Sequence, residues 1–233
     1  PRDYMAGFPW HPHRGIETIT YVLAGTVEHG DSLGNRGILG PGSLQLMTAG
    51  RGILHQEMPK GDAKGRMHGF QLWGNLPRAL KMTAPRYQEY GPERFPDIDI
   101  APGVRAKLIA GRIGAHEGAI RQPATDPTYF DLGLDAGARF DHALPTDHSA
   151  FVYVYEGAIA AGEGADAATV TAGELAILGP GEQARLEGRE NGSRLILVAG
   201  RPLREPVARY GPFVMNTQAE LRQAFEDFQA GRF

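Results

Sequence analysis

The amino-acid sequence predicts an all-β protein that contains two copies of one β fold and ends in a single helix. Three observations predict this class: a composition suited to short strands, an internal repeat of domain length, and a helix signal near the C-terminus. The 233 residues include 32 glycines and 17 prolines, and these residues favour tight turns between strands. Short runs of β-branched and aromatic residues lie between the turns, as is typical of strands.

Strand patterns are clearest in the first half of the chain. They cover residues 18–23, 26–28, 44–47, 68–73 and 106–110. Polar, glycine-containing segments separate them, such as residues 31–37 and the Pro41-Gly42 turn. Residues 1–10 lack a strand pattern and residues 78–103 are rich in proline, so we expect the first to be a loop and the second a connector.

The second half of the chain repeats the first. The run that ends at Gly25 resembles the run that ends at Gly157, 132 positions later. The turn at Gly42 likewise resembles the turn at Gly173, 131 positions later. A nearly constant offset of domain length indicates two copies of one fold. We therefore expect a first domain over residues 1–112, a second domain over 113–209 with strands in 128–140 and 195–199, and a C-terminal helical segment over 210–233.

The C-terminal segment carries the signal for a helix. Thr217 and Glu220 form a capping-box pattern. Leu221, Phe225 and Phe228 follow at the spacing of one helix face, and Gly231 comes after them. The apolar stripe needs a partner surface, and we expect the helix to pack on the outside of a sheet.

Composition excludes several classes of function. The net charge is −3 and the basic residues are scattered, so direct binding to nucleic acid is not expected. No apolar run approaches the length needed to span a membrane. The chain contains no cysteine, which rules out disulfides and thiolate ligands. These features lead us to expect a cytoplasmic protein in which any metal is held by histidine and carboxylate.

Two short motifs place such ligands together. His11 and His13 are two residues apart at the start of a strand pattern, and His55 and Glu57 repeat this spacing downstream. Residues two apart lie on the same face of a strand, so two such pairs on neighbouring strands would converge. The set suits a divalent transition metal with open positions. The alternative is a group of hydrogen-bonded histidines at the rim of the fold.

The charge of this set indicates the chemistry. Three neutral imidazoles and one carboxylate leave a divalent metal with a net charge of +1, which attracts a chelating oxyanion such as an enolate. The metal would lower the pKa of a bound hydroxyl and polarise a neighbouring carbonyl. Glu57 could act as a ligand, as a proton acceptor, or as both in turn.

The remaining histidines fit structural roles better. We expect His29 to be structural, His68 to lie in the core or behind the ligands, and His116 to lie on the surface. His142 and His148 stand near the start of the second repeat. The repeat offsets carry the four proposed ligands onto Ala143, Pro145, Leu186 and Gly188. The second copy is therefore expected to lack the ligands, which predicts one metal per chain.

Long segments of the chain resemble the pirin family. They are residues 11–18, 28–35, 47–57, 71–77 and 211–217, and the resemblance extends over the whole chain. It implies a bicupin fold of two antiparallel jelly-roll β-barrels, with a metal in the N-terminal barrel only. It also implies that His11, His13, His55 and Glu57 are the ligands. The metal is expected to be iron, with manganese, nickel, copper or zinc as alternatives.

The resemblance implies two classes of function. Several pirins act as flavonol 2,3-dioxygenases, which open quercetin with dioxygen and release carbon monoxide; here Glu57 would be the catalytic residue. Other pirins are non-catalytic regulators that sense the redox state of iron and act through protein partners. We favour the enzyme, with a flavonol or related chelating substrate and dioxygen as its partners.

Two features depart from related families. Most cupins take a glutamate ligand five residues after the second histidine, whereas Thr18 stands there in this chain and Glu17 precedes it. We therefore expect Glu57 to be the carboxylate ligand and Glu17 to be structural or to lie behind the ligands. Pirins also carry a few dozen residues before the first motif, so we expect the first domain to be truncated at its start.

Overall fold

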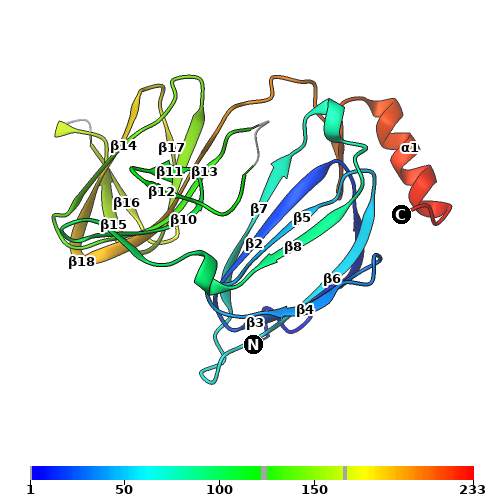
Figure 1. Cartoon of the computed structure of the whole chain (residues 1–233), viewed down its shortest axis with the longest axis horizontal. Coiled ribbons are helices and arrows are strands. Elements are labelled where there is room, and N and C mark those ends of the chain that lie inside the picture. Colours follow the sequence, from blue (N-terminus) through cyan, green and yellow to red (C-terminus); the bar gives the residue numbers. More distant parts are fainter. Residues whose placement is uncertain (1, 122–124, 165–166) are drawn as a thin grey trace. The chain divides into compact units, whose positions relative to one another are not determined.

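The computed structural model describes residues 2–121, 125–164 and 167–233, and it confirms an all-β chain with a C-terminal helix. The chain forms two compact units, Pro1–Arg94 with Arg204–Phe233, and Phe95–Leu203. Figure 1 shows both, coloured along the sequence. Residues 95–112 belong to the second unit and residues 210–233 to the first, whereas the sequence analysis drew its boundaries at 112 and 209. The C-terminal segment joins the first unit because its helix and last strands pack there.

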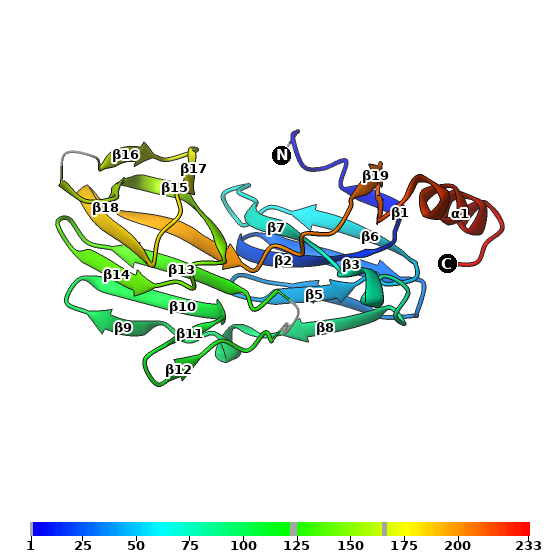
Figure 2. The same cartoon turned by 90° about the horizontal axis from the view of Figure 1, so that it is seen from above.

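Two four-stranded antiparallel sheets build the first unit, with strand orders β1-β6-β3-β4 and β7-β2-β5-β8. The strands of the first sheet are β1 (Phe8–His13), β3 (Thr26–Asp31), β4 (Arg36–Leu39) and β6 (Ile53–Lys60). Those of the second are β2 (Ile16–Ala24), β5 (Leu44–Thr48), β7 (His68–Asn75) and β8 (Arg86–Tyr90). Figure 2 shows these strands from above. Ile16, Met47 and Ile53 belong to a buried cluster of this unit.

Two of the expected irregular segments contain strands. Residues 78–103 hold β8 and β9 (Ile98–Ala101), together with short 3₁₀ turns at Arg78–Leu80 and Pro92–Arg94, so the connector prediction was wrong. Strand β1 begins at Phe8, within the segment expected to be a loop. In both cases the local residue pattern does not predict a strand. The strand forms because pairing with a neighbouring strand supplies its backbone hydrogen bonds.

The C-terminal helix α1 (Gln218–Gln229) begins as predicted. Thr217 and Glu220 form the capping box, with each side chain bonded to the other residue's backbone N–H. Leu221 and Ala224 are buried in a cluster with Phe213 of strand β20 (Phe213–Met215). Strand β20 pairs with β19 (Ala208–Tyr210). The helix therefore packs on a two-stranded hairpin of the first unit.

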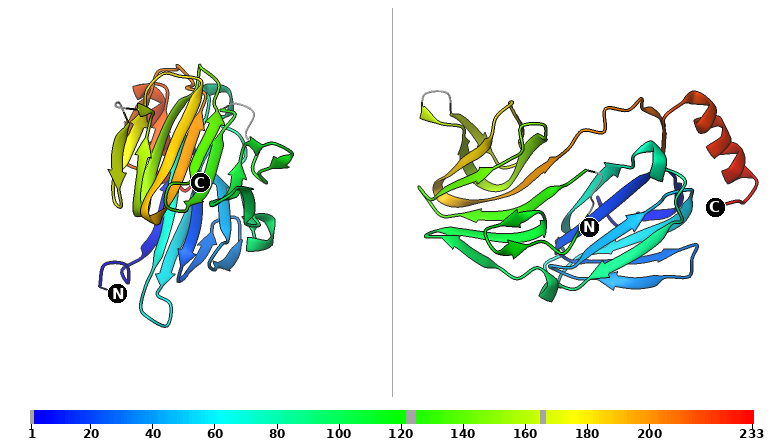
Figure 3. Two further views of the ribbon diagram at one scale, coloured as in Figure 1. Left: turned by 90° about the vertical axis from the view of Figure 1, so that its left-hand side faces the viewer. Right: turned by 45° about the horizontal axis from the view of Figure 1, so that its top comes forward.

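The second unit is organised around two long strands, β15 (Ser149–Ala161) and β18 (Gln183–Gly200), which are visible in Figure 3. Its main sheet has the order β16-β15-β18-β13-β10-β9, with β14 also paired to β18 and β17 to β15. The other strands are β10 (Val104–Ala110), β11 (Arg112–Ile113), β12 (His116–Glu117), β13 (Thr128–Leu134), β14 (Arg139–Ala143), β16 (Ala168–Thr171) and β17 (Leu175–Leu178). Phe130, Val152 and Leu197 are fully buried in its core. None of the described residues forms a helix long and apolar enough to cross a membrane.

Candidate metal centre

Three histidines converge inside the first unit. Strands β1 and β6 pair antiparallel, with His11 directly opposite His55. The imidazole of His13 shares the inward face with His11, because the two residues are two apart on one strand. One ligand nitrogen from each of the three rings lies within 4.8 Å of the other two. Among the described residues this is the one group of three or more histidine and acidic side chains with such spacing.

The surroundings of His13 and His55 favour the neutral imidazole, which is the form that binds a metal. Burial, followed by the neighbouring His11, lowers the pKa of His13 to about 4 and that of His55 to about 2. Both nitrogens of His55 and Nδ1 of His13 are buried without a hydrogen-bond partner. The His11 Nδ1 lies 2.7 Å from the Pro9 carbonyl oxygen, so Nδ1 donates to this carbonyl and Nε2 is the nitrogen left to bind a metal. Unpartnered neutral nitrogens facing one another fit a transition-metal site.

Glu57 lies two residues beyond His55 on β6, outside the group of three rings, and is held by neutral donors. Its Oε1 accepts a hydrogen bond from Thr20 Oγ1 at 3.1 Å. Gln71 Nε2 lies 2.9 Å from Oε1 and 2.8 Å from Oε2. Only 4% of the Glu57 surface is exposed. Because these donors carry no positive charge, they do not neutralise the carboxylate. Glu57 can therefore offset the charge of a metal ion or accept a proton.

The polar residues that surround this carboxylate were not predicted from the sequence. Gln71 and Trp73 are two apart on β7, and Trp73 Nε1 donates to Gln71 Oε1 at 3.0 Å. The Trp73 ring stands edge-on to His13, with ring centroids 5.0 Å apart. The only signal in the sequence was the spacing of Gln71 and Trp73, which repeats that of the two ligand motifs.

A cavity of about 340 Å³ opens beside Glu57 within the first unit. Its apolar walls include Val22, Val27, Met67 and Phe70, and Glu57 supplies its charge. Thr20 and Gln71 also line it. A mainly apolar cavity with a few convergent polar groups is typical of a small-molecule site.

The other histidines of the first unit lie around this centre without joining it. His29 is buried on β3, opposite Glu57 in the strand register, and its Nε2 lies 2.6 Å from Glu89 Oε1. His68 is exposed and lines the cavity, with its ring tilted against Phe70. The expected core position of His68 was therefore wrong.

The second unit repeats the strand pairing without the donors. Strands β14 and β18 pair with His142 opposite Ala184, where β1 and β6 place His11 opposite His55. Leu186 pairs with Ala161 of β15 as Glu57 pairs with His29 of β3, 132 positions before Ala161, so Leu186 takes the place of Glu57 and Ala184 that of His55. The repeat offset had instead placed His55 on Leu186. The register thus assigns His142 to the His11 position, one residue away from the Ala143 given by the repeat offset. Apolar Ala184 and Leu186 cannot hold a metal.

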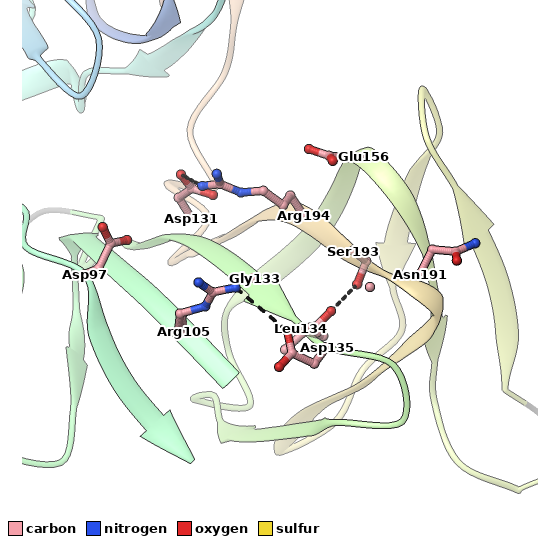
Figure 4. Close-up of a pocket in the computed structure, with 11 residues that line it drawn as sticks. Asp97, Arg105, Asp131, Gly133, Leu134, Asp135, Glu156, Asn191, Ser193 and Arg194 are labelled. Atoms are coloured by element: carbon pink, nitrogen blue, oxygen red, sulfur yellow. Dashed lines mark hydrogen bonds and ion pairs between the residues drawn. The ribbon is translucent and has the colours of Figure 1, made fainter. Parts of the chain in front are cut away.

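The second unit also contains a polar cavity of about 400 Å³, shown in Figure 4. Arg194 pairs with Asp131 at 3.1 Å, and Arg105 lies 3.8 Å from Asp135. No histidine lines this cavity. Four of its charged side chains form these two ion pairs, whereas the first unit holds buried imidazole nitrogens without a hydrogen-bond partner.

Comparisons with known proteins identify the family of both halves of the chain. The pirin family model matches residues 1–74, and the model of the pirin C-terminal cupin domain matches residues 129–233. A pirin-like protein from Caulobacter vibrioides is 47% identical over 232 residues, which cover 99% of this chain and 82% of that protein. The crystal structure of quercetin 2,3-dioxygenase from Acinetobacter baumannii has a TM-score of 0.88 at 36% identity, covering 97% of this chain and 79% of that one. The bacterial pirin YhhW from Escherichia coli, solved in complex with nickel(II), has a TM-score of 0.65 at 25% identity, covering 84% and 76%.

Proposed function

The chain belongs to the pirin family, and we propose that it is a metal-dependent dioxygenase that opens flavonols such as quercetin with dioxygen. The observation that carries the proposal is the convergence of three imidazoles, with Glu57 two residues beyond His55 on the same strand and lining an apolar cavity. The similarity to the Acinetobacter baumannii quercetin 2,3-dioxygenase supports the same reaction class.

The metal would be held by His11, His13, His55 and Glu57. The donor set of three nitrogens and one oxygen suits iron, and it also suits manganese, nickel, copper and zinc. We propose iron as the metal that supports turnover. When bound, the ion supplies a Lewis acid that lowers the pKa of a chelating hydroxyl and polarises the adjacent carbonyl.

Glu57 would act on the substrate's proton. A flavonol presents a hydroxyl next to a ring carbonyl, and the carboxylate is placed to accept the hydroxyl proton as the substrate enters. Thr20 and Gln71 keep the two carboxylate oxygens in a fixed orientation, so proton acceptance requires little rearrangement. Glu57 is therefore proposed both as a ligand and as the proton acceptor.

The cavity walls would bind the rest of the substrate. Val22, Val27 and Phe70 offer apolar surface to a planar aromatic ring and exclude water from the reacting face. The polar side of the cavity, formed by Thr20 and Gln71, lies next to Glu57. This distribution orients the chelating edge of a flavonol toward the carboxylate.

Oxygen uptake with quercetin tests the proposal. The iron-loaded wild-type chain is mixed with quercetin under anaerobic conditions, oxygenated buffer is added, and Glu57→Gln is measured in parallel. We expect rapid oxygen consumption by the wild type and its loss in the variant. Binding of quercetin without oxygen consumption would contradict the dioxygenase and favour a non-catalytic, iron-dependent regulator that acts through a protein partner.

A further inference from the structure

The C-terminal segment, residues 204–233, contacts the strand that carries His13. Arg14, the next residue, is 3% exposed although it is charged. Its Nη1 pairs with Asp227 Oδ2 of helix α1 at 2.7 Å, and its guanidinium lies 4.4 Å from the ring centroid of Phe233. Figure 1 shows the helix at the first unit, to which both ends of this ion pair belong.

Arg14 also connects the two ligand motifs. Its Nε donates to the carbonyl of Arg51, in the turn that leads into β6 and His55. Gly15 N–H donates to the carbonyl of Gly50 in the same turn, at 2.8 Å. The guanidinium that pairs with Asp227 is therefore attached to both segments that position the imidazoles.

The backbone of the C-terminal segment runs directly over the end of β1. Val214 N–H donates to the Arg14 carbonyl at 3.1 Å. The buried ammonium of Lys81 donates to the carbonyls of Gly15 and Val214, at 2.9 and 2.8 Å. Gly15 has φ +79°, and a Cβ there would clash with the Val214 carbonyl. Such close packing transmits a displacement of one segment to the other.

The same segment reaches the side chains of the centre. The backbone of Pro212 forms a hydrogen bond with the His13 ring. The Arg209 guanidinium lies 5.4 Å from the ring of Trp73, which stands edge-on to His13. A backbone carbonyl at a ligand imidazole fixes the orientation of its ring.

We propose that residues 204–233 position the His13 imidazole for metal binding, and that Asp227 is a positioning residue that acts through Arg14. This inference rests on the metal site of the proposed function. It goes beyond that function by assigning control of the centre's geometry to a helix more than 200 positions away in the sequence. Asp227 does not touch the metal or the substrate; it fixes the strand end from which His13 projects.

The test uses Co²⁺ as the probe, because its visible absorption reports ligand geometry. The full chain is titrated with Co²⁺ as wild type, as Asp227→Ala and as Arg232→Gln. Arg232 also pairs with Asp227, at 2.6 Å, and its side-chain hydrogen bonds go to the same carboxylate. Arg232→Gln therefore weakens the helix end while keeping the pair with Arg14. Removal of a group that orients a metal ligand typically costs about 10-fold or more in metal affinity.

We expect Asp227→Ala to bind Co²⁺ about 10-fold more weakly, with a shifted absorption band, and Arg232→Gln to match the wild type. An unshifted band with wild-type Co²⁺ affinity in Asp227→Ala would overturn the proposal. Equal effects of the two variants would also overturn it, because they would show that only the stability of the helix affects metal binding. If Asp227→Ala does not fold, Asp227→Asn replaces it under the same criteria. A wild-type chain that binds no Co²⁺ would instead overturn the metal site itself, and the inference with it.

Discussion

Gln71 Nε2 faces both carboxylate oxygens of Glu57, at 2.9 and 2.8 Å. Thr20 adds one further hydrogen bond to Oε1. Because these donors are neutral, they orient the carboxylate without cancelling its charge. The rate of the proposed reaction should then depend on Gln71 even though Gln71 is not proposed to bind the metal.

Replacement of Gln71 by leucine is expected to lower turnover about 10-fold or more while metal content stays near that of the wild type. The leucine removes the donor that fixes both oxygens of Glu57. Steady-state oxygen uptake measures the turnover, and elemental analysis of the same preparation measures the metal content. Gln56→Leu, on the neighbouring residue of β6, serves as the control. Unchanged turnover in Gln71→Leu would show that the Glu57 orientation does not limit the rate.

Replacement of His55 by alanine is expected to abolish metal binding and to leave the fold intact. Both ring nitrogens of His55 are buried without a partner, so removal of the ring exchanges an unsatisfied polar group for a cavity. Elemental analysis measures the metal, and thermal unfolding measures the fold. His68→Ala is the control, because His68 lines the cavity outside the ligand group. A full complement of metal in His55→Ala would refute the ligand assignment.

The helix contact predicts a graded loss of stability. Phe213 is fully buried against Phe225 and Phe228, whereas Phe225 is only partly buried. We expect Phe213→Ala to lower the free energy of unfolding by about 3–5 kcal/mol. Phe225→Ala should cost less, about 2 kcal/mol, because less surface returns to water. Urea denaturation measures both free energies of unfolding. A larger loss for Phe225→Ala than for Phe213→Ala would contradict the burial of these two side chains in the structure.

The Asp227 carboxylate predicts a dependence of stability on pH. Hydrogen bonds from Arg232, Arg14 and Gln223 hold the pKa of Asp227 well below its usual value of 3.8. A carboxyl whose pKa is lower in the folded state stabilises the fold above its unfolded pKa and loses this contribution as the pH falls toward its folded pKa.

The melting temperature of the wild type should therefore exceed that of Asp227→Asn at pH 6. The difference should shrink as the pH is lowered from about 4 toward 2, because in this range the carboxyl is protonated in the unfolded chain and not yet in the folded one, which favours unfolding. Melting curves across this range, with Glu226→Gln as the control, provide the measurement. A difference that stays constant with pH would mean that the Asp227 charge does not contribute.

The sequence predicted the parts that depend on local periodicity. The convergence of His11, His13 and His55 follows from spacings of two residues on strands, and the helix after Thr217 follows from its capping box. Strand β8 was missed because prolines flank it and its own residues alternate weakly. Its assignment depends on pairing with β5, which is a tertiary contact.

The surroundings of Glu57 could not be predicted for a similar reason. Thr20 and Gln71 come from two strands of the opposite sheet, and their hydrogen bonds to Glu57 exist only once the two sheets face each other. The equivalence of His142 and His11 also required the strand register. His142 lies 131 positions after His11 but Ala184 lies 129 positions after His55, so no single offset identifies both.

The proposed reaction has a distinctive product. Opening of the quercetin ring by a 2,3-dioxygenase consumes one dioxygen and releases one carbon monoxide for each quercetin. The most direct measurement is therefore the carbon monoxide formed per quercetin consumed by the iron-loaded chain. The account predicts a ratio of one, lost in Glu57→Gln. Consumption of quercetin without carbon monoxide would contradict it and indicate simple oxidation of the flavonol.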